Sequence, residues 1–232
     1  MDLRRQYYLQ AIGIQRWVSR QSANAAAGQE EPSPTPTAPA HSGPCAMMDW
    51  EELEERVSVC TACALHAGRK HTVFGAGNRI ADWMIIGEAP GAEEDAQGEP
   101  FVGRAGKLLN NMLKAIGLER DQVFIGNILK CRPPNNRDPQ PEEVKQCNAY
   151  LQRQIELIQP KIVLAVGRIA AQNLLHTEQT IGRLRGVVHN LPDHNIPLVV
   201  TYHPAYLLRK PTEKRKSWQD LILAYNAWKA GH

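Results

Sequence analysis

Four short apolar runs, rich in β-branched residues, alternate with amphipathic stretches from residue 82 onward. They read DWMIIG, QVFIGNIL, KIVLAVG and IPLVVTYH, and each is followed by Gly, Pro or Asn. Near-continuous apolar strands that alternate with helices are typical of a parallel sheet covered by helices on both faces. The pattern therefore predicts an α/β fold.

Three helices are predicted between and after these strands, because apolar positions recur there every three or four residues. The first would end at Gly117, the second would begin at Pro141, and the third would be capped by Ser217. Their apolar faces would be formed by Leu108, Leu109, Met112, Leu113 and Ile116, by Val144, Cys147, Leu151, Ile155 and Ile158, and by Trp218, Leu221, Ile222 and Tyr225.

In such a sheet, ligands bind beyond the carboxyl ends of the strands. The loops at these ends are the GEAPG turn at 87–91, the segment after Asn127, the turn at Gly167 and the turn at 203–204. The glycines of GEAPG would let backbone amides approach a ligand closely, although a plain tight turn has the same composition. The turn is neither a Walker loop nor G-x-G-x-x-G.

Composition changes sharply near residue 21. Residues 21–45 are rich in Ala, Pro, Ser and Thr and contain almost no large apolar side chain, so they are predicted to be a flexible linker. The linker would separate an N-terminal peptide (residues 1–20) from one domain (residues 46–232). Residues 3–18 have the pattern of a short amphipathic helix, which is marginal by itself.

Length and charge limit the function classes. The 232 residues, 43% hydrophobic and 22% charged, suit one globular domain with a tail. No apolar run approaches the ~20 residues needed to cross a bilayer, and no secretory signal is recognisable. We therefore expect a cytoplasmic protein without membrane contact. The net charge of +3 is compatible with a nucleic-acid partner but does not indicate one by itself.

Five cysteines in a chain kept in a reducing compartment point to metal binding rather than to disulfides. Cys60 and Cys63 form C-x2-C, and Cys131 and Cys147 follow. Four thiolates suit either a tetrahedral zinc ion or a [4Fe–4S] cluster. Because only one pair is close in sequence, the spacing favours the cluster, although Cys147 could simply be a core residue of its helix. Cys45 lies in the predicted linker and is interpreted as a bystander.

Several polar and aromatic side chains fall on the predicted rim. Glu88 follows a strand, where a carboxylate can orient a water or stabilise a cation, and Asn127 ends another strand with an amide suited to reading a base edge. Phe101 is either a core aromatic or a platform for stacking a flat ring. His203 is either structural or a ligand for an anionic polymer, since residues 209–216 carry five basic residues against one acidic one.

An acidic run, Glu93, Glu94 and Asp95, follows the GEAPG turn. Most acidic runs are solvated surface, so we expect at least one of these three side chains to be exposed and without a role. The others remain candidates for the rim.

Together these segments resemble the family 4 uracil-DNA glycosylases, the iron–sulfur branch of their superfamily. The resemblance covers about residues 50–228 and does not include the first 45. The matching segments are C-x2-C at 60–63, GEAPGAEED at 87–95, GEPFVGRAG at 98–106, GNILKCRPPNNRDP at 126–139, Cys147, and HPAYLLR at 203–209.

The resemblance implies a three-layer α/β/α fold with a four-stranded, mostly parallel sheet. It also implies a structural [4Fe–4S] cluster held by Cys60, Cys63, Cys131 and Cys147. The substrate would be uracil in DNA, flipped out of the stack into a pocket. The protein would be a monofunctional glycosylase that hydrolyses the N-glycosidic bond without lyase activity, starting base excision repair, and we expect it to be a monomer.

The family's roles carry over to matching positions. Phe101 would stack on uracil, Asn127 would read its polar edge, and His203 would stabilise the departing uracil anion. Gly87 and Ala89 would contact the base, with a thymine methyl excluded near their loop.

Glu88 would position the attacking water or stabilise the sugar cation. GEAPG lacks the Asp of the highly active family 1 enzymes, so Glu94 and Asp95 are reserves for this role. In HPAYLLR, Tyr206, Leu207 or Leu208 would wedge into the DNA, with Arg209 on phosphate.

The N-terminal segment carries a second, shorter resemblance. RRQYYLQAIGIQRWVSR is similar to the N-terminal peptide of the psi subunit of the bacterial DNA polymerase III clamp loader, which binds the chi subunit. The matching positions are Arg4, Arg5, Leu9, Gly13, Ile14 and Trp17. The resemblance implies that this peptide binds chi as a helix in a groove.

Two other function classes remain open from the sequence. A non-catalytic DNA-binding module could use the same fold with a structural metal. A nucleotide-handling enzyme could use GEAPG as a phosphate loop, but the lysine and metal-binding carboxylates expected of it are missing.

Overall fold

The computed structural model describes residues 45–231, which all belong to the unit His41–His232. The predicted N-terminal peptide and nearly all of the predicted linker lie outside the described residues. The helices are α2 (Trp50–Ser58), α3 (Ala92–Gln97), α4 (Arg104–Ala115), α5 (Pro141–Ile158), α6 (Arg168–Leu174), α7 (Ile181–Leu184), α8 (Pro204–Arg209) and α9 (Lys214–Ala230). The strands are β1 (Ala76–Gly77), β2 (Trp83–Gly87), β3 (Phe124–Asn127), β4 (Ile162–Val166), β5 (Val188–Leu191) and β6 (Ile196–Thr201).

The strands form one sheet in the order β1-β3-β2-β4-β6-β5. The central four, β3, β2, β4 and β6, are the predicted apolar runs and pair in parallel. The predicted count of four was too low, because β1 and β5 add an antiparallel strand at each edge. Neither could be seen in the hydrophobic pattern, since β1 has two residues and β5 is mostly exposed.

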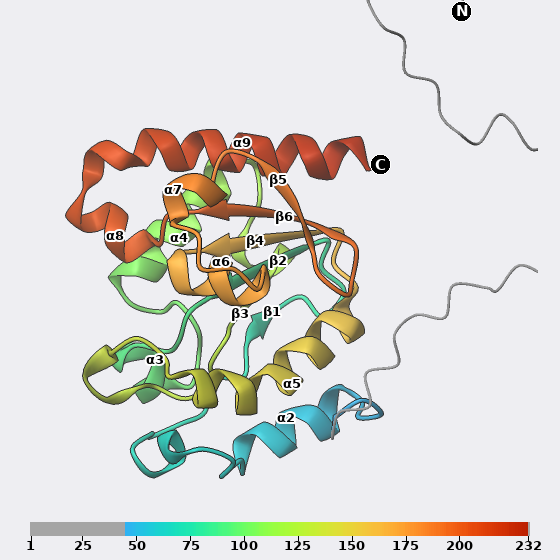
Figure 1. The fold of residues 1–232 in the computed structure, drawn as a ribbon, viewed down its shortest axis with the longest axis vertical. Helices are drawn as coiled ribbons and strands as arrows, with labels where there is room; N and C mark the ends of the chain where they lie inside the picture. The colour runs from blue at the N-terminus through green and yellow to red at the C-terminus, as the bar shows by residue number, and fades with distance from the viewer. Residues whose placement is uncertain (1–44, 232) are drawn as a thin grey trace, which may run out of the picture. The chain divides into compact units, whose positions relative to one another are not determined.

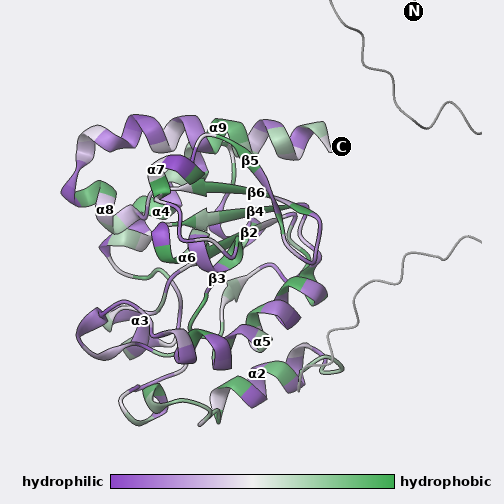
Figure 2. Cartoon of the chain, in the orientation of Figure 1, coloured by the Kyte–Doolittle hydropathy of each residue, from purple (hydrophilic) through white to green (hydrophobic). Residues whose placement is uncertain are grey.

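Helices cover both faces of the sheet, as predicted for a three-layer fold. In β2, Trp83 and Ile85 pack with α4 and α9, whereas Met84 and Ile86 pack with α2, α5 and α6. Figure 1 shows α9 on one side of the sheet and α5 and α2 on the other. The strands β2, β4 and β6 are uniformly apolar, whereas hydrophilic and hydrophobic residues alternate along the helices (Figure 2).

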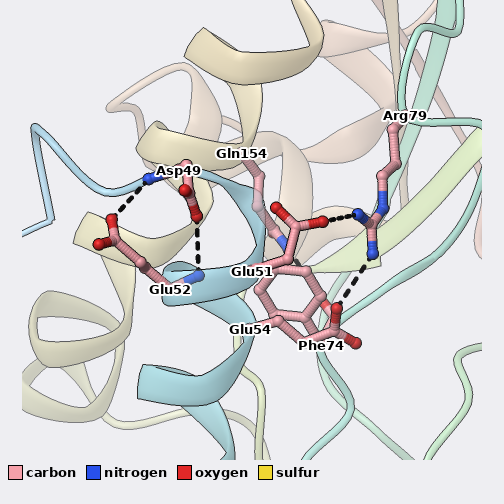
Figure 3. A network of polar contacts seen from close by, with 7 residues as sticks. All are labelled: Asp49, Glu51, Glu52, Glu54, Phe74, Arg79 and Gln154. Carbon is pink, nitrogen blue, oxygen red and sulfur yellow. Dashed lines mark hydrogen bonds and ion pairs between the residues drawn. The ribbon is translucent and has the colours of Figure 1, made fainter.

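Helix α2 is fixed to the domain by its own cap and by side chains from distant segments. Asp49 accepts a hydrogen bond from Glu52 N at 2.9 Å, and the Glu52 carboxylate accepts from Asp49 N at 3.0 Å, which completes a capping box (Figure 3). Arg79 bridges two exposed glutamates on the outer side of this helix (Figure 3). On the inner side, Trp50 packs edge-on against Phe74 at 5.4 Å. These contacts hold the chain that leads into the C-x2-C segment.

The helices predicted around 108–116 and from Pro141 are confirmed as α4 and α5. The prediction that Ser217 caps the last helix was wrong. Helix α9 begins at Lys214, because a 3-10 turn, Pro211–Glu213, leads directly into it, and Ser217 is buried inside the helix. Cys45 was assigned to the linker, but it is 3% exposed and packs in the hydrophobic core.

None of the helices within residues 45–231 is both long and apolar enough to cross a membrane.

Candidate active site

A cleft of about 430 Å³ lies where the central parallel strands end. It brings together most of the predicted site residues from segments that are up to 121 positions apart, the separation of Glu88 from Arg209. Those in its walls are Glu88, Ala89, Phe101, Asn127, His203, Tyr206 and Arg209. The structure therefore brings the residues predicted at the strand ends to one cleft.

Gly87 shapes the floor of the cleft rather than lining it. It is paired with Asn127 across β2 and β3. A Cβ at position 87 would lie 2.4 Å from Asn127 Oδ1 and 2.7 Å from Phe101 Cζ, which is too close for any side chain. A glycine here lets the amide and the aromatic ring converge on the same small volume.

Asn127 carries a side chain that is unusual for its surroundings. The residue is only 2% exposed, and its Oδ1 has no hydrogen-bond partner among residues 45–231. A buried amide oxygen without a partner carries a desolvation cost of about 1–3 kcal/mol. Since this amide lines the cleft, a ligand that donates a hydrogen bond to it would remove that cost.

His203 is held as a neutral imidazole with a defined tautomer. Its Nδ1 accepts a hydrogen bond from Ala205 N at 3.1 Å, so the proton of the neutral ring is on Nε2. Burial lowers the pKa of His203 to about 4, with the nearby Arg209 charge lowering it further and Glu94 opposing. Near neutral pH, the ring can therefore offer an Nε2–H donor to the cleft.

Gly167 makes room for this histidine. Its φ of +103° is a conformation that L side chains rarely adopt, and a Cβ there would lie 3.1 Å from His203 Cβ. The imidazole also lies against the Phe101 ring, with centroids 5.6 Å apart and planes 29° from parallel. The two rings thus form one wall of the cleft.

Glu88 is half-buried and ionises at a higher pH than an ordinary glutamate. Burial is the main reason that its pKa rises to about 7, and the Asp138 carboxylate raises it further, while Arg168 lowers it. Asp138 and Arg168 form an ion pair at 2.6 Å. The sequence reasoning missed both residues; Asp138 belongs to the NRDP end of a quoted motif, whereas no sequence signal singles out Arg168.

The acidic run after GEAPG divides into three different environments. Glu93 is exposed, as expected for at least one member. Glu94 accepts hydrogen bonds from three backbone amides, those of Gly91, Val102 and Gly103. Asp95 is 3% exposed and accepts from Lys70 N at 2.9 Å. Glu94 lines the cleft, but both of its carboxylate oxygens already accept from backbone amides, whereas Asp95 is buried and does not line the cleft. Their reserve role in water activation stays a prediction.

The HPAYLLR segment forms α8, and its side chains point in different directions. Tyr206 and Arg209 line the cleft. Leu207 is 1% exposed and packs in the core, so its predicted role as a wedge into DNA is contradicted. Leu208 is half-buried and is not part of the cleft wall. Which of these side chains can reach a ligand depends on which side of the short helix α8 is buried. The sequence alone did not determine that side.

Cys60, Cys63, Cys131 and Cys147 line a second, narrow cavity. Among residues 45–231, no three His, Cys, Asp or Glu side chains are close enough together to hold a single metal ion. The four sulfurs nevertheless surround one space, and all are free thiols. Cys45, also buried, does not line this cavity.

Three of the four sulfurs already receive hydrogen bonds. The donors are Arg69 Nη1 to Cys131 at 3.2 Å, Tyr150 Oη to Cys60 at 3.1 Å, and Lys130 N to Cys147 at 3.3 Å. Burial raises the pKa of the Cys147 thiol to about 12, so this sulfur needs a cation to be held as thiolate. Donors around a set of thiolates are the usual surroundings of a metal–sulfur site.

Lys130 connects the cavity to the cleft. While its backbone amide faces Cys147, its Nζ donates to Asn127 O at 3.1 Å and to Gln154 Oε1 at 2.6 Å. The side chain is almost completely buried, at 1% exposure. Gln154 is itself held by donating to Phe74 O at 3.0 Å (Figure 3). One lysine therefore contacts both the cysteine region and the residue that carries the unpaired amide oxygen.

Comparisons with known proteins match this architecture. Residues 74–225 match the model of the Uracil DNA glycosylase superfamily. The chain is 46% identical over 180 residues to the type-4 uracil-DNA glycosylase of Archaeoglobus fulgidus, covering 75% of this chain and 90% of that protein. It is 44% identical over 161 residues to the type-4 enzyme of Thermotoga maritima, covering 68% and 83%. A type-5 uracil-DNA glycosylase of Pyrobaculum aerophilum is 30% identical over 150 residues, covering 56% and 64%.

Proposed function

Since the chain belongs to the uracil DNA glycosylase superfamily and, within it, to the type-4 uracil-DNA glycosylases, we propose how its cleft removes uracil from DNA. The observation that carries the proposal is the buried, unpaired Oδ1 of Asn127, which lines the same cleft as the Nε2–H donor of His203. Uracil offers an N–H and carbonyl oxygens along one edge, which is the complement of this pair. The base would enter after flipping out of the stack.

Asn127 selects the base by its edge. Its Oδ1 accepts from uracil N3–H and its amide NH₂ donates to O4, which are the two positions at which cytosine has the opposite hydrogen-bonding character. Cytosine would leave Oδ1 buried without a donor, a loss of about 1–3 kcal/mol. Phe101 stacks on the ring from the neighbouring wall. Ala89 lines the cleft directly after the Gly87–Glu88 turn, and the proposal places the exclusion of a thymine methyl at this loop.

His203 acts on the leaving group. When the N-glycosidic bond breaks, negative charge develops on uracil, and the Nε2–H of the neutral imidazole donates to O2 where that charge collects. A donor that is already fixed in place stabilises such charge strongly, because it needs no reorganisation. The bond from Ala205 N to Nδ1 keeps the proton on the nitrogen where it is needed.

Glu88 acts on the sugar side of the cleaved bond. In its ionised form it orients the attacking water or stabilises the positive charge on the sugar. Its pKa of about 7 means that roughly half of the molecules carry this charge near neutral pH. No lysine is among the residues of 45–231 that line the cleft, which supports hydrolysis of the bond without a strand-cutting step.

The direct test uses an end-labelled oligonucleotide with a single uracil, treated with the purified protein and then with hot alkali. We expect strand scission only after alkali, which identifies a monofunctional glycosylase. Scission without alkali would contradict the absence of a lyase step. Tight DNA binding without any base release would favour the non-catalytic module, and binding of free nucleotides would favour the nucleotide-handling enzyme.

We also propose that Cys60, Cys63, Cys131 and Cys147 hold a [4Fe–4S] cluster. Four thiols around one cavity, with donors already directed at three sulfurs, support this donor set. A bound cluster would supply a cross-link between the C-x2-C segment, the loop after β3 and helix α5. Iron and acid-labile sulfide, assayed on protein purified without oxygen, should each approach four per chain; one zinc per chain would contradict the assignment.

DNA would be held along α8 and the segment after it. Arg209 lines the cleft and is exposed, which suits a phosphate contact. Tyr206 or Leu208 would fill the gap left by the flipped base. Arg209→Ala should weaken DNA binding and reduce its salt dependence, whereas an equal loss at every salt concentration would contradict a phosphate contact.

For the N-terminal peptide, we propose docking on the chi subunit of the clamp loader, which would bring repair to replication. The support is the sequence resemblance around Trp17 alone. Equal capture of chi by the wild type and by Trp17→Ala would contradict this docking. A monomer at work in the cytoplasm, where thiols stay reduced, completes the proposal; sedimentation of a dimer would correct it.

A further inference from the structure

Phe101 has a backbone conformation that an aromatic residue rarely adopts. Its φ is +53°, in the left-handed region that favours glycine. Such conformations persist only where the surrounding structure imposes them, and they concentrate at functional sites. The residue is also 6% exposed and lies at the wall of the cleft, against His203. Something must therefore hold the backbone on both sides of this residue.

The backbone that follows Phe101 is held by a hydrogen-bond acceptor, the carboxylate of Glu94. Glu94 Oε1 accepts from Val102 N at 3.0 Å and from Gly103 N at 3.1 Å, and its other oxygen accepts from Gly91 N at 3.2 Å. One carboxylate thus ties the chain that follows Phe101 to the GEAPG turn.

The backbone that precedes Phe101 is held by a hydrogen-bond donor, the guanidinium of Arg120. Arg120, in the 3-10 turn Arg120–Gln122, donates from Nη2 to Pro100 O at 2.6 Å. Its Nη1 makes longer contacts with Phe101 O at 3.4 Å and with Asn110 Oδ1 at 3.3 Å. The guanidinium is a rigid fork of donors, so it can hold two successive carbonyls in a fixed relation.

Helix α4 closes the third side. A Cβ at Gly106 would lie 1.7 Å from Phe101 O, so the first turn of this helix passes directly against the Phe101 carbonyl. Arg120 itself is not part of the cleft wall. It contacts the carbonyls of Pro100 and Phe101, whereas the Phe101 residue itself lines the cleft.

We propose that Arg120 is a positioning residue, which holds Phe101 in its left-handed conformation so that the ring presents its face to the flipped base. The inference rests on the proposed stacking role of Phe101. Arg120 contributes nothing to the chemistry by itself; its effect on the reaction passes through the ring. A guanidinium that only stabilised the fold would act whether or not the ring was present, and this difference can be measured.

The experiment is a double-mutant cycle with Arg120→Met, Phe101→Ala and the double variant, measured as kcat/KM on uracil-containing DNA. Stacking a base on an aromatic ring contributes enough that Phe101→Ala should lose about 10-fold to 100-fold. Arg120→Met should lose about 10-fold, mostly through a higher KM, because the ring binds the base before and during the reaction. In the Phe101→Ala background, Arg120→Met should change kcat/KM by less than about twofold.

Arg153→Met is the matched control. Arg153 also donates to a backbone carbonyl, Met48 O at 2.7 Å, but it does not line the cleft. It should leave kcat/KM unchanged in both backgrounds. If Arg120→Met does not fold, Arg120→Lys is used instead, because it keeps one donor for Pro100 O. We expect it to lower kcat/KM by less than about 10-fold in the wild-type background. In the Phe101→Ala background it should again change kcat/KM by less than about twofold.

The outcomes separate this inference from the function on which it rests. An equal loss from Arg120→Met, or from Arg120→Lys, with and without the Phe101 ring would overturn the positioning role while leaving stacking intact. Full activity of Phe101→Ala would overturn stacking and the inference together. Loss of base release by Phe101→Ala, with no further loss in the double variant, is the result we expect.

Discussion

The cleft and the cysteine cavity are built in opposite ways. The cleft residues Glu88 and Asn127 sit at or just beyond the ends of paired strands, where the sheet register fixes them without any ligand. The cysteines come from a loop, from the segment after β3 and from helix α5, and their sulfurs are oriented by side chains such as Arg69 and Tyr150. Hence the cleft should tolerate changes in its own side chains without loss of fold, whereas the cavity should not.

The largest expected effect is a catalytic loss in the cleft without loss of stability. His203→Ala removes the donor that would stabilise the uracil anion, so kcat should fall by about 10²–10³-fold. The melting temperature should change by only a few degrees, since this ring faces the cleft. His189→Ala is the control, because His189 contacts a backbone carbonyl, Leu184 O at 2.6 Å, outside the cleft. If His203→Ala lowered both kcat and the melting temperature strongly, the expectation that cleft side chains act on catalysis and not on stability would be wrong.

A change in the cavity should have the opposite signature. Cys147→Ser should lose bound iron and visible absorbance and lower the melting temperature by roughly 5–10 °C, on the scale of 2–4 °C per kcal/mol for a chain of this size. Activity should fall only as far as folded protein is lost. Cys45→Ser is a matched control with an equally buried sulfur that does not line the cavity, and it should retain its iron. Iron retained by Cys147→Ser would contradict the donor set.

The sequence could predict the residues at strand ends, but not those that reach the site only through tertiary contacts. Asn127 and His203 could be found because apolar strands end visibly in the sequence and parallel strands end at one rim. By contrast, Arg120 and Arg168 meet the site only through tertiary contacts with no local signature. Leu207 shows the limit within a motif, since the choice between wedge and core depends on which side of α8 faces the sheet.

The lysine between the two regions should give an intermediate effect. Lys130→Met keeps the backbone amide that faces Cys147 but removes the Nζ donor to Asn127 O. We expect about a 10-fold loss of kcat/KM on uracil DNA, the usual worth of a hydrogen bond from a charged group, with iron content preserved. Lys145→Met, at an exposed position of α5, is the control. Loss of iron together with activity would mean that Lys130 acts on the cavity rather than on the cleft.

The smallest expected effect is a shift of the pH profile of kcat/KM. The direction of the shift should differ between variants of Asp138 and variants of Arg168, the two charged neighbours of Glu88. Because Glu88 must be ionised to act and burial raises its pKa to about 7, kcat/KM should rise with pH through that value. His203, with its pKa near 4, adds no second change between pH 5 and 9. Glu88→Gln should abolish the rising limb altogether.

Asp138→Asn removes a negative charge that makes ionisation of Glu88 harder, so the limb should move to lower pH. Arg168→Gln removes a positive charge that makes ionisation of Glu88 easier, so the rise of kcat/KM should move to higher pH. Both shifts should be partial, because burial, the main cause, remains in each variant. Since Asp138 and Arg168 form an ion pair, a purely structural disturbance would move both profiles in the same direction, and that result would rule out the electrostatic account.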